Sequence, residues 1–234
     1  MLILFDIDAT LISTTRAGMH AMRDAGQELY GPSFSVDRTE FAGRLDPLIV
    51  RDLLRDNERE VTVAASGAMR EGYRRHLGRR LSEPGVAFAL PGVQELLADL
   101  RNRKGVTLGV LTGNYADTGA LKLRAAGIDP GQFSVQVWGD ESPHDPPCRD
   151  HLPPLALRRY EAGCNGDLRG RSAASLTTII GDTPHDVRCA LASECRVLGV
   201  ATGSYQVAEL KNAGAHLAVE SLLDTGAITA WLLR

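Results

Sequence analysis

The sequence has few cysteines, and they form no pattern. Four occur among 234 residues, and no two are spaced as a CxxC pair. In a chain of this length, cysteines scattered in this way do not form the dense disulfide framework of small secreted proteins. We therefore expect reduced thiols and a cytoplasmic protein.

Long apolar runs are also absent. No stretch approaches the roughly 20 apolar residues that a membrane-spanning helix needs. The apolar run after Met1 ends at Asp6, has no basic residue before it and is too short for a signal peptide. The sequence therefore predicts a soluble protein with no membrane partner.

A large excess of charge of one sign is absent as well. The chain has 26 basic and 29 acidic residues, a formal net charge of -3, and these residues are spread along its length. A protein that follows a nucleic-acid backbone needs a basic face, so we expect no nucleic-acid partner. The hydrophobic content of 44% is enough for one core domain with a modest insertion.

What the sequence does contain is a series of short apolar runs that stop at polar clusters, with helical patterns between them. This arrangement predicts an α/β fold with a Rossmann-like parallel sheet. The runs cover residues 2–5, 107–111, 134–138, 177–180 and 197–200. Ligands bind beyond the carboxyl ends of such strands, so turns far apart in sequence can form one site.

Residues 14–89 interrupt the alternation, because they contain helical segments and no convincing strand. We expect an inserted all-helical cap over 14–89 and a core domain made of 1–13 and 90–234. The cap helices are expected at 16–29, from Asp46 as N-cap with Pro47 as the first helical residue, and at 61–81.

The return to the core is expected after Pro91 and Gly92. An amphipathic helix follows, and its predicted buried face is formed by Val93, Leu96, Leu97 and Leu100. Later, residues 139–154 are expected to form a loop that ends in a helix.

Asp6 and Asp8 follow the first apolar run at alternate positions. In a continuing strand both side chains would face the same side. One carboxylate could attack phosphorus while the other handles the proton of the leaving group, with a metal cation to offset the negative charges. A pair of aspartates that only holds a turn is the alternative.

A second turn follows the run 107–111. Thr112, Gly113 and Asn114 offer a hydroxyl and two backbone amides where a helix is expected to begin, which suits a bound anion. The alternative is that Thr112 or Asn114 only caps the helix.

A third turn follows the run 177–180 and contains Asp182 and Asp186. Magnesium prefers oxygen ligands of this kind. Thr183, Pro184 and Asp186 also fit a helix capping box, which would account for Asp186 but leaves Asp182 without a structural reason.

Together the three turns resemble those of the haloacid dehalogenase (HAD) superfamily, and more closely its phosphoglycolate-phosphatase-like branch, which carries a helical cap. The matching residues occur in the family order, and the resemblance covers essentially the whole chain. They are Asp6-x-Asp8-x-Thr10, Thr112-Gly113-Asn114 and Gly181-Asp182-x-x-x-Asp186.

The resemblance implies an aspartyl-phosphate mechanism. Asp6 would attack phosphorus, and Asp8 would protonate the leaving oxygen and later activate water. Mg²⁺ would be bound by the Asp6 carboxylate, the main-chain carbonyl of Asp8 and Asp182, with Asp186 helping directly or through water. The residues that would hold the phosphoryl oxygens are Thr112, Gly113 and Asn114.

The sequence departs from the family pattern at three positions. Ala9 stands where the family has Gly, and Glu194 stands in a turn where related sequences tend to have Gly. The family lysine between the second and third turns is absent, since residues 125–180 contain no lysine. Arg149 occupies its place, and we expect it to bridge nucleophile and phosphate; an exposed loop arginine is the alternative.

In the expected cap, the loop 41–47 resembles the loop that such phosphatases lay over the substrate. Arg44 is the candidate for contact with the leaving group, and a solvated loop arginine is the alternative. Asp46 is interpreted as the helix N-cap.

The function that the resemblance implies is a phosphatase acting on a small phosphorylated metabolite. A phosphoglucomutase-like phosphomutase on the same residues is one alternative, and a non-catalytic HAD-like or receiver-like binding protein is another. Dehalogenase chemistry is disfavoured, because a halide leaving group does not require Asp8. We expect a monomer or a homodimer.

Overall fold

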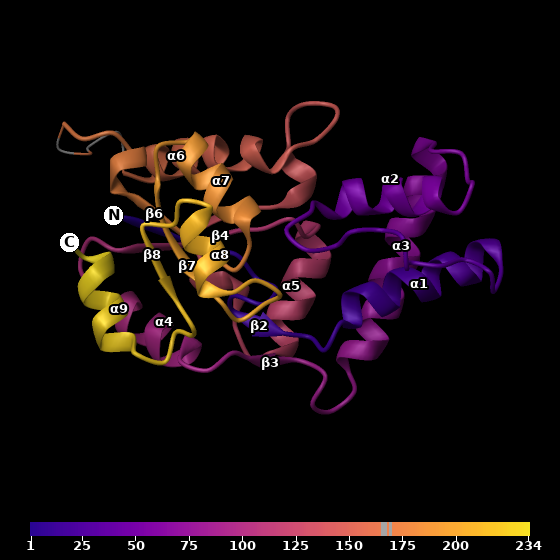
Figure 1. Cartoon of the computed structure of the whole chain (residues 1–234), viewed down its shortest axis with the longest axis horizontal. Helices are drawn as coiled ribbons and strands as arrows, with labels where there is room; N and C mark the ends of the chain where they lie inside the picture. The colour runs from indigo at the N-terminus through magenta and orange to yellow at the C-terminus, as the bar shows by residue number, and fades with distance from the viewer. Residues whose placement is uncertain (165–167, 169) are drawn as a thin grey trace.

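The computed structural model describes residues 1–164, 168 and 170–234 and has a parallel six-stranded sheet at its centre (Figure 1). The strand order is β5-β4-β1-β6-β7-β8, and every pairing between neighbours is parallel. The strands are β1 (Leu2–Phe5), β4 (Thr107–Leu111), β5 (Val135–Val137), β6 (Thr177–Gly181), β7 (Arg196–Val200) and β8 (Leu217–Val219). All five predicted runs are strands; β8, a short and half-exposed edge strand, was missed.

Helices cover both faces of the sheet, because the side chains of each strand alternate between two hydrophobic cores. Ile3 and Phe5 of β1 belong to one core, and Leu2 and Leu4 belong to the other. The first core is closed by α4 (Val93–Arg101), α5 (Ala116–Ala125) and α9 (Thr225–Leu232). The second is closed by α6 (Leu152–Gly163), α7 (Pro184–Ala192) and α8 (Val207–Asn212).

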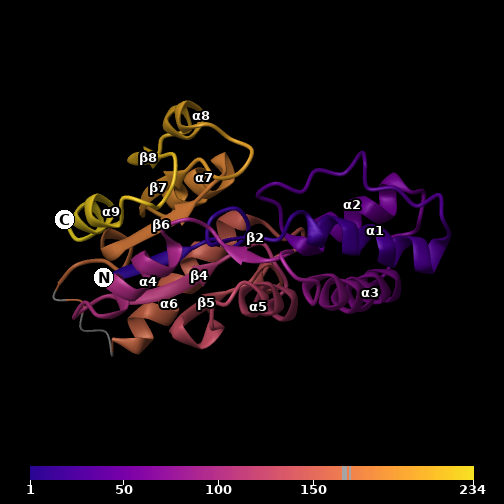
Figure 2. The same ribbon diagram turned by 90° about the horizontal axis from the view of Figure 1, so that it is seen from below.

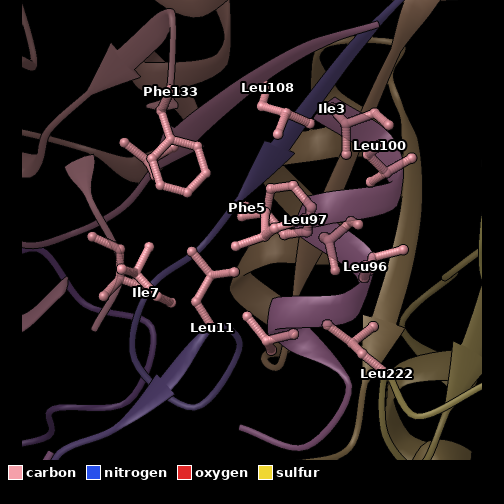
Figure 3. Packing of buried hydrophobic residues seen from close by; sticks show 14 of the residues in the cluster. Ile3, Phe5, Ile7, Leu11, Leu96, Leu97, Leu100, Leu108, Phe133 and Leu222 are labelled. Carbon is pink, nitrogen blue, oxygen red and sulfur yellow. The ribbon is translucent and has the colours of Figure 1, made fainter. Parts of the chain in front are cut away.

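Figure 3 shows the packing of the first core, in which α4 lies against β1. The four residues of α4 that the sequence predicted on one face, Val93, Leu96, Leu97 and Leu100, are all buried. The predicted loop over 139–154 contains two short 3₁₀ turns, Gly139–Glu141 and Arg149–His151, before α6 begins.

Between β1 and α4 the chain forms a helical insert, defined here as residues 14–89. Its helices are α1 (Ala17–Tyr30), α2 (Asp46–Asp56) and α3 (Val63–Leu81), and they share a third hydrophobic core. Figures 1 and 2 both show these helices beside the sheet, at the end opposite the two chain termini. The insert therefore stands at the carboxyl edge of the parallel strands.

The expectation of no strand within 14–89 was wrong at one point. β2 (Ile12–Ser13) and β3 (Phe88–Ala89) form a short antiparallel pair where the chain leaves the core and returns to it. Two-residue strands carry too little alternation to be seen in sequence. This pair fixes the two connections of the insert side by side.

The prediction that Asp46 is the N-cap of α2 was also wrong. The helix begins at Asp46, and its N-cap is Leu45. The side chain of Leu45 makes no capping hydrogen bond, and the Asp46 carboxylate is turned towards the start of α5, where it accepts a hydrogen bond from the backbone N–H of Tyr115.

Within residues 1–164, 168 and 170–234, no helix combines the length and the apolarity that crossing a membrane requires.

Two of the departures from the family pattern fall at left-handed backbone positions. Ala9 has φ 55° and Glu194 has φ 57°. For residues with a Cβ this conformation costs roughly 1–2 kcal/mol, and glycine adopts it without that cost. Both residues therefore carry local backbone strain.

Candidate active site

The three polar turns predicted from sequence lie side by side. They follow β1, β4 and β6, which are neighbours in the sheet and in parallel register. Asp6, Thr112 and Asp182 therefore line the same cavity, which has a volume of about 280 Å³. Residues of the helical insert, including Arg44 and Tyr73, line it as well.

Arg149 lines this cavity and is buried, so it is not an exposed loop arginine. Its side chain is 4% exposed, and its Nη2 atom is 3.2 Å from Oδ1 of Asp6. The same guanidinium donates a hydrogen bond to Asp186. Burial acts to lower the pKa of Arg149, but Asp186 and Asp6 outweigh it and raise the pKa above its ordinary value. A buried, permanent positive charge thus faces the predicted nucleophile.

Three carboxylates surround this charge. One oxygen from each of Asp6, Asp182 and Asp186 lies within 4.8 Å of the others, and all three residues are buried. Burial raises the pKa of Asp6 to about 6, with Arg149 opposing the shift. Burial, then the charges of Asp186 and Asp6, raise the pKa of Asp182. Burial is thus the main cause of both shifts, and the neighbouring carboxylates add to it.

The donor set of this cluster fits a divalent cation. Three carboxylates and one guanidinium leave an excess of two negative charges when all are ionised. Carboxylate oxygens are the ligands that Mg²⁺ prefers. The side chain of Asp8 lies outside the cluster, so only its main chain is left for the metal contact that the resemblance implies.

Besides its place in the carboxylate cluster, Asp186 caps the start of helix α7. Its Oδ2 atom accepts hydrogen bonds from the backbone N–H and the hydroxyl of Thr183, at 3.0 and 2.7 Å. This is the capping box predicted for α7. Its Oδ1 atom is bound by Arg149. Both oxygens are therefore engaged within the protein, which favours contact with a metal through water over direct ligation.

The second turn presents its groups to the cavity. Thr112 is fully buried, and its hydroxyl oxygen accepts a hydrogen bond from Nδ2 of Asn114 at 2.8 Å. The N-cap of α5 is Tyr115, so Thr112 and Asn114 do not serve as the cap. A Cβ at Gly113 would lie 2.2 Å from the main-chain oxygen of Arg44, so only glycine permits this approach of the insert to the turn.

Sequence reasoning missed Lys122 of α5. The side chain is buried, and Nζ is 2.6 Å from Oδ2 of Asp8 and 2.6 Å from Oδ1 of Asn114. Burial acts to lower the pKa of Lys122, but the carboxylate of Asp8 outweighs it, so the pKa lies above its ordinary value. The sequence carries no signal for this role, because a polar pair four residues apart, such as Thr118 and Lys122, also fits a solvated helix face, and only the structure shows both side chains buried on α5.

Asp46 is the second polar residue whose place was not foreseen. Its carboxylate accepts hydrogen bonds from the backbone N–H of Tyr115 at 3.0 Å and from the Thr118 hydroxyl at 3.4 Å. Its backbone N–H donates to the carbonyl of Gly113 at 2.7 Å. The insert is thereby attached to the second turn and to the start of α5.

Arg44 lines the cavity, but its guanidinium is not free. It forms ion pairs with Asp52, and with Glu40 at 3.5 Å, and its side chain is 27% exposed. Arg44 is therefore neither a fully solvated loop residue nor a charge that points without a partner into the cavity.

Comparison with known proteins agrees with the geometry. The model of the haloacid dehalogenase-like hydrolase family matches residues 3–191. The chain belongs to this family. A protein of Dickeya dadantii (strain 3937) named "Probable phosphatase IndB" is 28% identical over 235 residues, which cover 100% of this chain and 95% of that protein.

Solved structures share the fold. A hydrolase from Pseudomonas syringae has a TM-score of 0.73 at 22% identity, covering 98% of this chain and 97% of its own. CbbY from Rhodobacter sphaeroides, solved with xylulose-(1,5)bisphosphate, has a TM-score of 0.76 at 21% identity, covering 95% of each chain. The Rossmann-like α/β core predicted from sequence is thus confirmed, and the protein is a member of a hydrolase family.

Proposed function

We propose that the protein is a Mg²⁺-dependent phosphatase that hydrolyses a small phosphate monoester through an aspartyl-phosphate intermediate on Asp6. The observation that carries the proposal is the position of Asp6. It lies 3.2 Å from the buried cation of Arg149 and beside the carboxylates of Asp182 and Asp186, in the lining of a cavity to which the helical insert also contributes residues.

Each part of the proposed reaction has a candidate among the residues of the cavity. An oxygen of Asp6 attacks phosphorus, and the bond from phosphorus to the ester oxygen breaks. Asp8 gives its proton to the departing oxygen, and then takes a proton from the water that attacks the phosphoryl group on Asp6. The second attack releases inorganic phosphate and restores Asp6.

The phosphoryl oxygens need donors, and the second turn has them. The Thr112 hydroxyl and the amides of Gly113 and Asn114 are proposed to hold these oxygens, and the Arg149 guanidinium is proposed to offset their charge. Mg²⁺, held by Asp6, the main chain of Asp8 and Asp182, with Asp186 acting through water, would neutralise charge on the nucleophile and the phosphoryl group.

The helical insert is proposed to act as a cap domain over residues 14–89, on a core of 1–13 and 90–234. A cavity closed by such a cap excludes bulk water during phosphoryl transfer. Arg44 is proposed to contact the leaving group, which requires it to exchange part of its pairing with Asp52 and Glu40 for the substrate. A reducing, cytoplasmic compartment is proposed as well, supported by the four free cysteines.

The test is phosphate release from a panel of small phosphate esters, with Mg²⁺ and with EDTA. The proposal expects Mg²⁺-dependent release by the wild type and its loss in Asp6→Asn. The exposed Asp37→Asn is the matched control and should behave as the wild type. Absence of release by the wild type across the panel, with Asp6→Asn indistinguishable from it, would contradict the proposal.

A phosphomutase would behave differently in the same assay. It returns the phosphoryl group to a sugar, so free phosphate would appear slowly and a sugar bisphosphate would accelerate interconversion of sugar monophosphates. Rapid release of phosphate without a bisphosphate favours the phosphatase.

A further inference from the structure

Lys122 is a buried cation to which the proposed reaction gives no task. We propose that Lys122 is a positioning residue, which holds the carboxyl group of Asp8 in place, so that the proton on its other oxygen passes to the leaving group when the helical insert is seated. This inference rests on the proposed phosphatase function and adds a residue to its machinery.

The first support is the way in which Asp8 is held. Its Oδ2 atom accepts a hydrogen bond from Nζ of Lys122 at 2.6 Å and another from Nδ2 of Asn114 at 2.8 Å. Among the described residues, no hydrogen bond engages its Oδ1 atom. Two donors thus fix one oxygen of the carboxylate and leave the other for a leaving group or a water molecule.

The second support is that Lys122 itself is held. Its Nζ atom also donates to Oδ1 of Asn114 at 2.6 Å, so Lys122, Asn114 and Asp8 form a closed triangle of hydrogen bonds. The hydroxyl of Thr112 fixes the amide of Asn114 in turn. Side chains whose partners are themselves fixed have little freedom to move away from the reacting atoms.

The third support is that the insert encloses the ammonium group. A Cβ built at Gly18 of α1 would lie 3.3 Å from Nζ of Lys122 and 3.4 Å from the hydroxyl of Tyr73 on α3. Two helices of the insert therefore pack against a side chain of the core. If the insert moved away, water would reach Lys122 and its hold on Asp8 would weaken.

Lys122 and Arg149, both buried in the lining of the cavity, have separate partners. Arg149 pairs with Asp6 and Asp186, whereas Lys122 pairs with Asp8. A lysine that served stability alone would affect all substrates alike, whether or not their leaving group needs a proton. The two roles can be separated with substrates that differ in their need for that proton.

The experiment compares kcat/KM for p-nitrophenyl phosphate and for a simple alkyl phosphate, because kcat/KM reports the step in which the leaving group departs. Nitrophenolate is a weak base and leaves without a proton. An alkoxide is a strong base, so it needs a proton from a general acid as it leaves. Lys122→Met should lower kcat/KM for the alkyl phosphate roughly 10²-fold, the size of a general-acid contribution, and affect p-nitrophenyl phosphate far less. Asp8→Asn should give the same pattern, and the exposed Lys104→Met should leave both values unchanged.

An equal loss of kcat/KM on both substrates in Lys122→Met, accompanied by a lower melting temperature, would overturn the inference and leave the phosphatase proposal standing. If Lys122→Met does not fold, Lys122→Arg replaces it in the experiment. The planar guanidinium of arginine keeps the positive charge but cannot occupy the position of the ammonium group between Asp8 and Asn114. The same selective defect is expected, and equal losses or wild-type values on both substrates would again count against the inference. A wild type that releases no phosphate from these two esters or from any ester of the panel would remove the phosphatase proposal and this inference with it.

Discussion

The carboxylate of Asp46, in the first turn of α2, accepts a hydrogen bond at 3.0 Å from the backbone N–H of Tyr115, the N-cap residue of α5. A residue of the helical insert thus caps a helix of the core. The backbone N–H of Asp46 donates at 2.7 Å to the carbonyl of Gly113, in the second turn. The position of the insert and the geometry of the proposed phosphate-binding turn are therefore linked through one residue.

This contact predicts a pH dependence of stability. Burial raises the pKa of Asp46 from 3.8 to about 6, with Lys122 and the Tyr115 N–H opposing the shift and Asp8 adding to it. The folded state then holds the proton more tightly than the unfolded state. The stability that this proton contributes is complete below about pH 4 and is lost as the pH rises through about 6.

Asp46→Asn removes this dependence and keeps an oxygen for the Tyr115 N–H. At neutral pH its free energy of unfolding should exceed that of the wild type by about 1–3 kcal/mol, and below about pH 4 the two should agree. Urea denaturation at a series of pH values measures this. A variant less stable than the wild type at neutral pH would mean that the charged hydrogen bond outweighs the cost of burial.

The buried ion pairs of Arg149 predict a large effect on stability. Arg149→Met leaves Asp6 and Asp186 without their common cation, and removal of one partner from a buried pair costs about 3–5 kcal/mol. Urea denaturation without divalent metal should show a loss of this size, and activity should be lost too. Arg149→Lys keeps a positive charge, so it should lose less stability and less activity than Arg149→Met.

The exposed Arg158→Met, on α6, is the matched control and should unfold at the wild-type urea concentration. If Arg149→Met were as stable as the wild type, the buried ion pairs would contribute nothing to the free energy of unfolding. The assignment of Arg149 to the site would then lose support.

The left-handed backbone at Glu194 predicts that a single substitution will stabilise the protein. Glu194 is exposed and has φ 57°, so Glu194→Gly relieves strain without opening a cavity. The free energy of unfolding should rise by about 0.5–1 kcal/mol, since the relief of strain exceeds the added freedom of the unfolded chain. Thermal denaturation measures the change.

Glu60→Gly is the matched control, because Glu60 is exposed and lacks a positive φ. This variant should be no more stable than the wild type. Equal stabilisation by both glycines would show that backbone strain at Glu194 is not the cause.

The core of the fold could be predicted because its signal is local. Each buried strand is an apolar run of a few residues, and each run stops at the polar turn that enters the cavity. The positions of Asp6, Thr112 and Asp182 at one edge follow from parallel strands alone. β8 escaped prediction because it is a three-residue edge strand with only one buried side chain.

The parts that escaped prediction depend on contacts between the core and the insert. Lys122 is 114 residues from Asp8, and nothing in its immediate sequence marks it as different from a lysine on a solvated helix face. Asp46 fits an N-cap by its sequence, and only the approach of the first turn of α2 to the start of α5 turns its carboxylate to Tyr115. The contacts of such side chains are determined by tertiary packing, which cannot be predicted from a single sequence.

The most direct test of the central claim is identification of the phosphorylated residue. The reaction of the wild type with p-nitrophenyl phosphate and Mg²⁺ is quenched in acid within the first turnovers, treated with borohydride, and mapped by peptide mass spectrometry. Borohydride converts an aspartyl phosphate to the corresponding alcohol, and we predict that this product appears at Asp6 and at no other aspartate. Its appearance at Asp8 or Asp182, or its absence at every aspartate while phosphate is released, would contradict the account.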